Sequence, residues 1–220
     1  MSTVLSIKQL GKSFPSAAGE VHAVRDVSLE VSAGELVTVR GPSGCGKSTL
    51  LMAAGGLLEP TSGAVEVNGT DLYSLGQDGR AQFRAENIGF VFQQFHLIPY
   101  LDVRDNILAA SLAAAGADAS RAEELLAVFG LEHRAHHVPA ALSTGEKQRT
   151  AMARALFNNP RLILADEPTG NLDRDNAEAL LEQLLGFTGK GGAVLLVTHD
   201  ARVDEHAGRT IEISEGSLVS

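Results

Sequence analysis

The stretch GPSGCGKST, residues 41–49, decides the fold of this chain. Its glycines at 41 and 46, lysine at 47 and serine at 48 complete the spacing of a phosphate-binding P-loop. A short apolar segment, 35–40, precedes the motif, and residues 47–58 have helical character. This strand–loop–helix context disfavours a chance glycine-rich turn and predicts an α/β fold with a P-loop NTPase core.

The P-loop residues predict how a nucleotide would be held. Glycines allow backbone N–H groups to turn inward around a phosphate, and the following helix adds the positive end of its dipole. Lys47 can reach the β- and γ-phosphates, and the Ser48 hydroxyl can complete the coordination of Mg²⁺. The residues expected to contact ATP here are Gly41, Pro42, Ser43, Gly44, Cys45, Gly46, Lys47, Ser48 and Thr49.

The stretch RLILADEP, residues 161–168, predicts the second half of the site. Four apolar residues run into Asp166 and Glu167, at the carboxyl end of a strand, where α/β ligands collect. We expect Asp166 to hold Mg²⁺ and Glu167 to orient or deprotonate the attacking water. A solvated acidic turn is the alternative, which the upstream P-loop disfavours. His199 ends another apolar strand, where a lone His is more often structural; with the P-loop and the carboxylate pair on neighbouring strands, contact with the γ-phosphate is favoured.

The rest of the pattern predicts a mixed sheet, an N-terminal antiparallel β subdomain and an inserted helical subdomain. Residues 11–20, rich in Gly, Pro and Ser, are expected to form a loop. Strands are expected at 4–10, 21–31, 35–40, 63–68, 88–93, 161–165 and 193–198, with a hairpin in 209–219. Helices are expected at 47–58, 103–115, 120–129, 145–156 and 176–187.

Composition narrows the class of protein. The 220 residues carry a net charge of −9, which argues against a protein that coats nucleic acid. Cys45 is the only cysteine, so no internal disulfide is expected and a reducing compartment is favoured. No run approaches the roughly 18 apolar residues of a membrane span, and the N-terminus does not resemble a signal peptide. We therefore expect a cytoplasmic protein.

The motifs GPSGCGKST, VFQQ, LSTGEKQR, LILADEPTGNLD and VTHD occur in this order along nearly the whole chain. In this respect the chain resembles the nucleotide-binding domain of an ABC ATPase. The resemblance implies a single domain, 1–220, with an α/β core in 1–93 and 157–220 and a helical subdomain in 94–156.

The resemblance also implies roles for particular residues. Gln93, or less favourably Gln94, would link Mg²⁺ and the γ-phosphate to a membrane partner. Ser143 and Gly145 of the signature motif would contact the γ-phosphate bound by the opposite subunit. The D-loop would comprise Asn171, Leu172 and Asp173, with Asp173 near the nucleotide. The expected catalytic residues are Lys47, Gln93, Glu167 and His199, and the expected metal-binding residues are Ser48, Gln93 and Asp166.

Phe14 falls where an aromatic ring would stack on adenine; an ordinary core Phe is the alternative. Thr144 stands where the signature motif usually has Gly. Because Ser143 and Gly145 remain, activity is expected to persist, and the geometry and rate of dimer closure are the properties in question.

The segments VFQQFHLIP and DEPTGNLD are similar to the corresponding segments in ATPases of lipoprotein-releasing, macrolide-export and haem- or peptide-export systems. This implies a homodimer that closes head to tail around two MgATP molecules. It would drive an integral-membrane permease with few spans and a large external domain from the cytoplasmic face. One alternative is a soluble ABC-type ATPase acting on DNA or ribosomes, but the chain is acidic and lacks long coiled-coil insertions or a second ATPase domain. A small-molecule P-loop kinase would leave residues 142–156 and His199 without a role.

Overall fold

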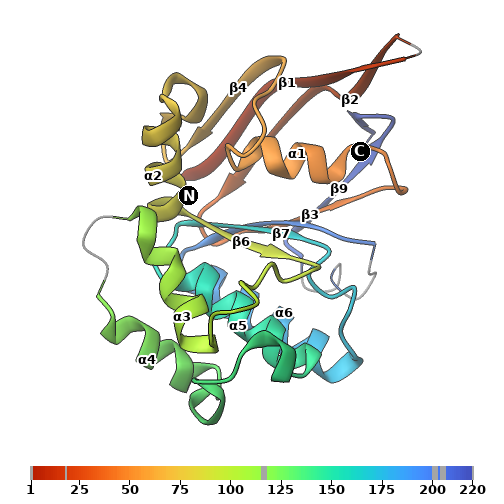
Figure 1. Cartoon of the computed structure of the whole chain (residues 1–220). Helices are drawn as coiled ribbons and strands as arrows, with labels where there is room; N and C mark the ends of the chain where they lie inside the picture. Colours follow the sequence, from red (N-terminus) through yellow and green to blue (C-terminus); the bar gives the residue numbers. More distant parts are fainter. Residues whose placement is uncertain (1, 18, 115–117, 200–202, 204–206, 220) are drawn as a thin grey trace.

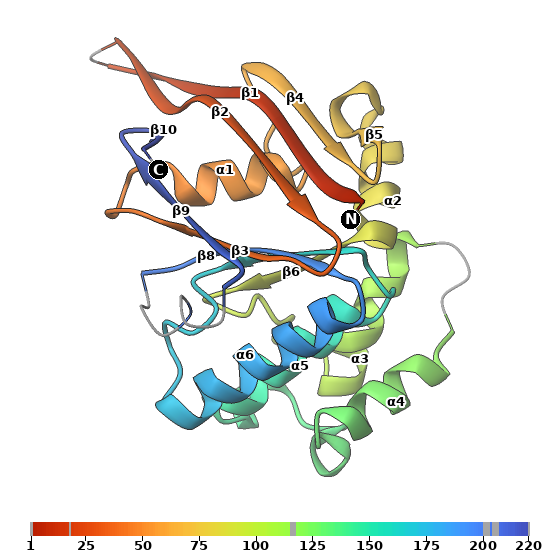
Figure 2. The same ribbon diagram turned by 180° about the vertical axis from the view of Figure 1, so that it is seen from behind.

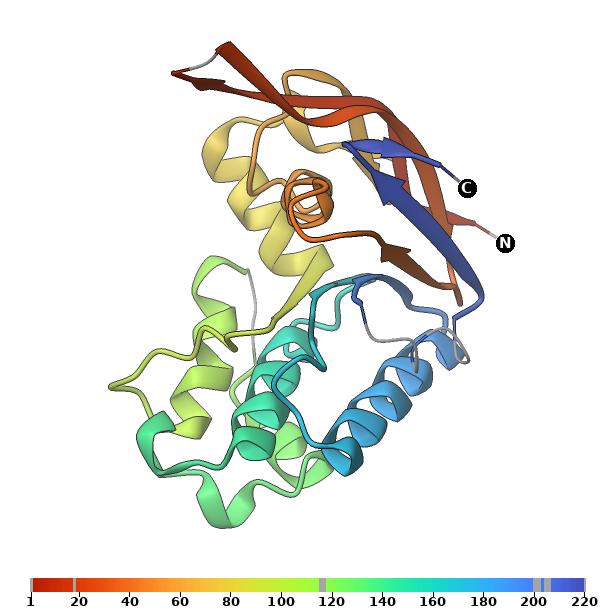
Figure 3. The same ribbon diagram turned by 90° about the vertical axis from the view of Figure 1, so that its right-hand side faces the viewer.

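The computed structural model describes residues 2–17, 19–114, 118–199, 203 and 207–219. Helix α1 (Lys47–Ala54) lies between two β-sheets, and further helices cover the opposite face of the second sheet (Figures 1 and 2). Viewed from the side, these layers stack with α1 seen end-on in the upper half (Figure 3). The predicted α/β architecture is confirmed.

The N-terminal sheet is antiparallel, with strand order β2-β1-β4-β5. Its strands are β1 (Thr3–Ser16), β2 (Gly19–Ser32), β4 (Ser62–Val67) and β5 (Thr70–Asp71). The prediction of a loop over 11–20 is wrong, because most of that segment extends the β1–β2 hairpin. Beyond Gly11, β1 pairs with β2 alone, so Pro15 occupies an edge, where its missing N–H costs no ladder bond.

The second sheet has the order β10-β9-β3-β8-β7-β6. It is mixed, because β10 pairs antiparallel with β9 and all other pairs are parallel. Its strands are β3 (Leu36–Arg40), β6 (Ile88–Phe92), β7 (Leu162–Asp166), β8 (Ala193–Val197), β9 (Arg209–Ser214) and β10 (Ser217–Leu218).

Alternation along the central strands explains why both faces of this sheet are covered. Leu162 and Leu164 of β7 pack in the cluster that includes Leu50 and Leu51 of α1. Ile163 and Ala165, which alternate with them, pack in the cluster formed with the opposite helices. A strand buried on both faces reads as a continuous apolar run, as predicted for this segment.

The segment between β6 and β7 is helical, and the described residues between them contain no strand. The helices are α3 (Val103–Leu108), α4 (Ser120–Val128) and α5 (Thr144–Leu156), with 3₁₀ turns at Ala109–Ala113, Glu132–Arg134 and Pro139–Ala141. Ala115, the end of one predicted helix, lies outside the described residues.

Three other helical segments complete the fold. Helix α6 (Arg174–Gly189) begins two residues before its predicted start, and the 3₁₀ turn Leu72–Ser74 follows β5. Helix α2 (Gln77–Asn87) was not predicted; most of its residues are polar, and it buries none of them fully. Helix α1 ends at Ala54 rather than at Leu58, because Gly55 and Gly56 follow. None of the helices within the described ranges has the length and apolar character needed to cross a membrane.

Candidate nucleotide-binding site

The P-loop follows β3 and takes a shape that only glycine allows at two positions. Gly41 and Gly46 have φ angles of 152° and 106°. A Cβ at Gly46 would overlap the carbonyl oxygen of Ala23 on β2, and one at Gly41 would overlap that of Ile213 on β9. The loop is therefore shaped by strands from both sheets as well as by its own residues.

The Lys47 ammonium lies inside this loop. Only 9% of Lys47 is exposed, and its Nζ donates to the carbonyl oxygens of Gly41 at 2.8 Å and Pro42 at 2.9 Å. The buried thiol of Cys45 lies 3.8 Å away. The hydrogen bonds of this buried cation go to neutral carbonyl groups, so the arrangement suits phosphate oxygens.

Ser48 and Asp166 meet at the end of β7. The Ser48 hydroxyl donates to Asp166 Oδ1 at 3.2 Å. Burial raises the pKa of the Asp166 carboxyl, and the neighbouring Glu167 adds to the effect, while Ser48 and Lys47 oppose it. A hydroxyl and a carboxylate at this separation are the hard oxygen donors that Mg²⁺ prefers, so the residues fit that ion.

Glu167 is held by His199 and by a backbone contact. Its φ angle is 46°, and its backbone N–H donates to the carbonyl oxygen of Val197 at 2.8 Å. Its Oε1 lies 2.9 Å from His199 Nδ1, and its Oε2 accepts the His199 backbone N–H at 3.2 Å. A left-handed non-glycine residue is strained, and such strain is typical of functional sites. The carboxylate is thereby fixed beside the Ser48–Asp166 pair.

Gln93 follows directly after β6, whose last residue Phe92 pairs with Asp166. The Gln93 carbonyl oxygen accepts a hydrogen bond from Asn171 Nδ2 at 2.9 Å. A Cβ at Gly170 would lie 2.8 Å from Gln93 Nε2, so that side chain packs against the segment after Glu167. Gln93 therefore lies at the same sheet edge as the two carboxylates. Gln94 is also exposed, and its carbonyl oxygen accepts the His96 backbone N–H at 2.6 Å.

The signature motif is built around the N-terminus of α5. Ser143 caps the helix: its hydroxyl accepts the Glu146 backbone N–H, and Glu146 Oε2 accepts the Ser143 backbone N–H at 2.7 Å. Arg134 Nε donates to Glu146 Oε1 at 2.7 Å. These groups, with the Ser143 backbone N–H foremost, lower the pKa of Glu146 to about 2. The result is a rigid, capped helix start that leaves Ser143 exposed.

The sites expected on either side of a dimer are separate within one chain. The hydrogen bonds of Ser143 stay within its own helix cap. Gly145 and Asp173 meet instead at Asn176 in the first turn of α6. The structure thus assembles one cluster around Lys47 and Glu167 and a second around the signature helix.

Phe14 lies on the β1–β2 hairpin. Its ring is 37% exposed and lies under Lys12 Nζ, 5.2 Å from the ring centroid. Phe14 is therefore not an ordinary core residue, and its ring stays accessible for contact with a ligand.

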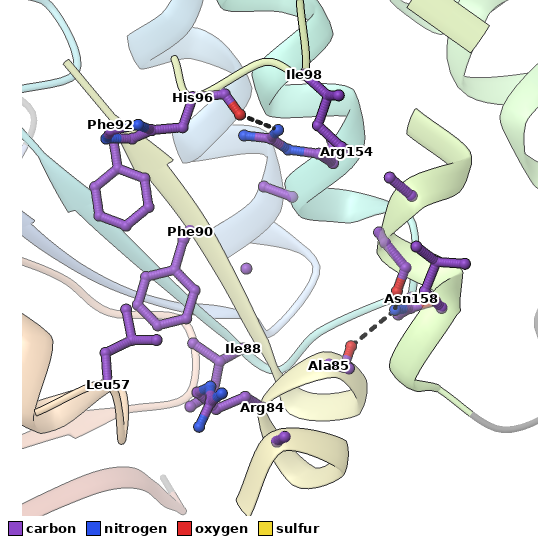
Figure 4. A pocket seen from close by; sticks show the side chains of 16 residues that line it. Leu57, Arg84, Ala85, Ile88, Phe90, Phe92, His96, Ile98, Arg154 and Asn158 are labelled. Carbon is purple, nitrogen blue, oxygen red and sulfur yellow. Dashed lines mark hydrogen bonds between the residues drawn. The ribbon is translucent and has the colours of Figure 1, made fainter. Parts of the chain in front are cut away.

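A groove of about 510 Å³ lies between α2, β6 and α5, away from the P-loop (Figure 4). Phe90 and Phe92 project into it from β6. Arg154 of α5 donates to the carbonyl oxygens of His96 at 2.6 Å and Phe95 at 2.7 Å. Phe95 and His96 both have positive φ angles, of 60° and 47°, so one guanidinium stabilises a strained turn just after Gln93.

The residues that orient the site were not identified from the sequence. Arg134, Arg154 and Asn176 contact residues 12, 58 and 27 positions away, at separations that no local pattern shows. One signal was available for Asn176: Asp173 is a favourable N-cap residue, and its spacing placed Asn176 in the first helical turn.

Comparisons with known proteins all find ATP-binding proteins of transport systems. A family model described as "ABC transporter" matches residues 24–170. The lipoprotein-releasing system ATP-binding protein LolD 1 of Rhodopirellula baltica is 44% identical, covering 98% of this chain and 96% of that protein. The macrolide export ATP-binding/permease protein MacB of Shigella flexneri is 42% identical over the full length of this chain, which spans 34% of that protein.

Solved structures similar to this chain are also ATP-binding cassettes or parts of ABC transporter complexes. A dimeric structure of the ATP-binding cassette MJ0796, in a post-hydrolysis state bound to ADP and Pi, superposes with a TM-score of 0.91 at 37% identity. The match covers 98% of this chain and 97% of that one. The structure of cbiO1 from Clostridium perfringens, part of the ABC transporter complex cbiONQ, gives a TM-score of 0.84 at 25% identity, covering 100% of this chain and 88% of that one.

Proposed function

Since this chain belongs to the ABC transporter family, of which it is an ATPase subunit, we propose that two copies close head to tail around two MgATP molecules and drive a separate membrane permease. The observation that carries this proposal is the division of the site within one chain. One cluster can bind the phosphates, while the exposed, capped start of α5 is set apart from it. A second copy would bring the two clusters together.

In the proposed mechanism, the P-loop N–H groups and Lys47 bind the β- and γ-phosphates, and Phe14 stacks on the adenine. Ser48, Asp166 and Gln93 would hold Mg²⁺, which when bound neutralises charge on the phosphate oxygens. Glu167, oriented by His199, takes the proton of the attacking water. The exposed His199 ring would also contact the γ-phosphate. Ser143, Gly145 and Asp173 complete the site of the opposite subunit.

The proposed partner is an integral-membrane permease, so the subunit would be peripheral on the cytoplasmic face of the membrane. Two kinds of relative support this: one belongs to a lipoprotein-releasing system, and the other is described as an ATP-binding/permease protein. We propose no role for nucleic acid, in keeping with the net charge of −9.

The groove at Phe90 and Phe92 is the proposed docking surface of the permease. Leu112 at its rim is 86% exposed, and the floor is apolar. Burial lowers the pKa of both Arg84 and Arg154, which line the groove. This chemistry suits an apolar segment of the permease that carries a carboxylate or the carbonyl end of a helix. Because the groove adjoins the turn after Gln93, movement of the docked segment would reach the nucleotide site.

Ser143→Arg tests the dimer. A long cation at the exposed helix start should block the opposite nucleotide site, so turnover should be lost while nucleotide binding to the monomer is retained. Ser120→Arg, at the exposed start of α4 in the same helical segment, is the matched control and should leave turnover unchanged. Normal turnover by Ser143→Arg would refute engagement across the dimer.

Leu112→Glu tests the docking surface. The variant should keep ATP binding but lose co-purification with a membrane protein from its host. The control is Val128→Glu, also exposed, at 74%, but outside the groove. Co-purification of both variants and of the parent with nucleic acid, instead of a membrane protein, would favour the ATPase class that acts on DNA or ribosomes.

A further inference from the structure

Asn176 lies where the D-loop meets the signature helix. Its backbone N–H donates to Asp173 Oδ1 at 2.9 Å, and its side-chain Nδ2 donates to Oδ1 at 2.8 Å and Oδ2 at 2.9 Å. The backbone N–H, and after it the side-chain amide, lower the pKa of Asp173. Both carboxylate oxygens of Asp173 are therefore held by one neighbouring residue.

The other side of the same amide rests against the signature helix. A Cβ at Gly145 would overlap Asn176 Oδ1 and lie 2.8 Å from Asn176 Cγ. Gly145 has a right-handed helical backbone, so its conformation alone does not require glycine. Glycine is needed here because the Asn176 amide occupies the space of a side chain.

A third contact fixes the orientation of the amide. Arg149, one turn further along α5, donates from Nη1 to Asn176 Oδ1 at 3.5 Å. The donors of Asn176 thus face Asp173, and its acceptor faces α5. Because its NH₂ group donates and its oxygen accepts, this partly buried amide has a single favourable orientation.

We propose that Asn176 is a positioning residue that keeps Asp173 and the start of α5 in fixed register, so that the D-loop and the signature motif meet the opposite subunit as one surface. The inference rests on the proposed head-to-tail dimer. Without Asn176, each segment would have to be ordered separately during closure, which would weaken dimerisation without changing how a monomer binds nucleotide.

A thermal double-mutant cycle tests the contact without needing a dimer. Gly145→Ala should lower the Tm by several degrees, because its methyl group meets the Asn176 amide. In the Asn176→Ala background the same change should be neutral or should raise the Tm, since alanine favours a helix over glycine. Equal Tm shifts in both backgrounds would overturn the contact.

A dimerisation assay tests the positioning role. In a Glu167→Gln background, the ATP concentration that half-saturates dimer formation is measured by size-exclusion chromatography. Asn176→Ala should raise this half-saturating ATP concentration about tenfold, while the affinity of the monomer for a fluorescent ATP analogue stays unchanged. Asn176→Asp should raise it further, because its carboxylate would face that of Asp173. Glu182→Ala, exposed on the same helix, is the control.

The outcomes separate the two proposals. If Ser143→Arg abolishes turnover but Asn176→Ala dimerises like its parent, the positioning role is refuted and the dimer stands. If the Glu167→Gln parent forms no ATP-dependent dimer, the proposed dimer fails and the positioning role fails with it. A loss of monomer nucleotide affinity in Asn176→Ala would also overturn the inference, because it would show a general structural defect.

Discussion

His199 contacts both oxygens of the Glu167 carboxylate: Nδ1 lies 2.9 Å from Oε1, and the backbone N–H donates to Oε2 at 3.2 Å. The two residues come from the ends of adjacent strands and were expected to act on the same phosphate, but their direct contact was not foreseen. The carboxylate is thus fixed by two donors, while the His199 ring remains 72% exposed and able to face a ligand. A base held in place before the substrate arrives needs less reorganisation during the reaction.

Glu167→Gln should leave ATP binding intact and reduce turnover by roughly 10²- to 10⁴-fold, because an amide cannot accept the proton of water. The ATP-bound dimer should then accumulate, as measured by chromatography with ATP. Glu178→Gln changes an exposed carboxylate on α6 in the same way and should have normal turnover. Wild-type hydrolysis by Glu167→Gln would remove Glu167 from its proposed role.

Ser48→Ala should weaken nucleotide binding mainly when Mg²⁺ is present. The change removes the hydroxyl that faces Asp166 but leaves Lys47 and the loop backbone in place. Isothermal titration with ATP in Mg²⁺ and in EDTA would show a smaller difference between the two conditions for the variant than for the wild type. Ser74→Ala, remote from the site, serves as control. An unchanged Mg²⁺ dependence would contradict metal binding at Ser48.

Glu146→Gln should destabilise the fold in a pH-dependent way. The Glu146 carboxyl has a pKa of about 2 in the folded chain against an ordinary 4.5. Its ionised form therefore stabilises the fold above pH 4.5, and this contribution is lost as the pH falls toward 2. At pH 7 the variant should lose roughly 1–3 kcal/mol, because charged hydrogen bonds to Ser143 and Arg134 are removed.

Thermal unfolding between pH 7 and pH 3 checks this expectation. The Tm difference between the wild type and Glu146→Gln should narrow below pH 4.5. Glu132→Gln, exposed and nearby, should show little difference at any pH. A gap that stays constant with pH would contradict the stabilising role of the ionised carboxylate.

Thr144→Gly tests the irregular position of the signature motif. Thr144 is the first residue of α5, has no positive φ angle and is exposed, so the isolated chain accommodates it without strain. Glycine should cost up to about 1 kcal/mol of helix stability. Nucleotide binding should not change, and steady-state turnover should rise if the threonine methyl slows dimer closure. Turnover equal to or below that of the wild type would show that Thr144 does not restrain closure.

Local patterns were sufficient to predict the centre of the fold. The P-loop can be identified from the spacing of its glycines, lysine and serine. The apolar runs at 161–165 and 193–198 are continuous because helices cover both faces of those strands. The sequence also placed Ser48 and Asp166 at one site, because the strand that precedes the P-loop and β7 end at the same edge of the sheet.

Long-range contacts account for what could not be predicted. Residues 11–20 carry loop-forming side chains, yet pairing with β2 keeps most of them extended. Helix α2 is mostly polar and buries none of its residues fully, so it lacks the strongly apolar face by which the other helices were predicted. Arg154 contacts the carbonyl oxygen of His96, 58 residues away, and Asn176 contacts Arg149, 27 residues away. Separations of this size leave no periodic trace in the sequence.

The overlap that a Cβ at Gly46 would have with the Ala23 carbonyl has a consequence for how the P-loop forms. Residues 41–49 form a contiguous sequence motif, but the path of their backbone also depends on contacts with β2 on one side and β9 on the other. A peptide of residues 41–49 alone would lack these contacts with β2 and β9. Phosphate recognition in this protein therefore depends on the folded positions of β2 and β9 as well as on residues 41–49 themselves.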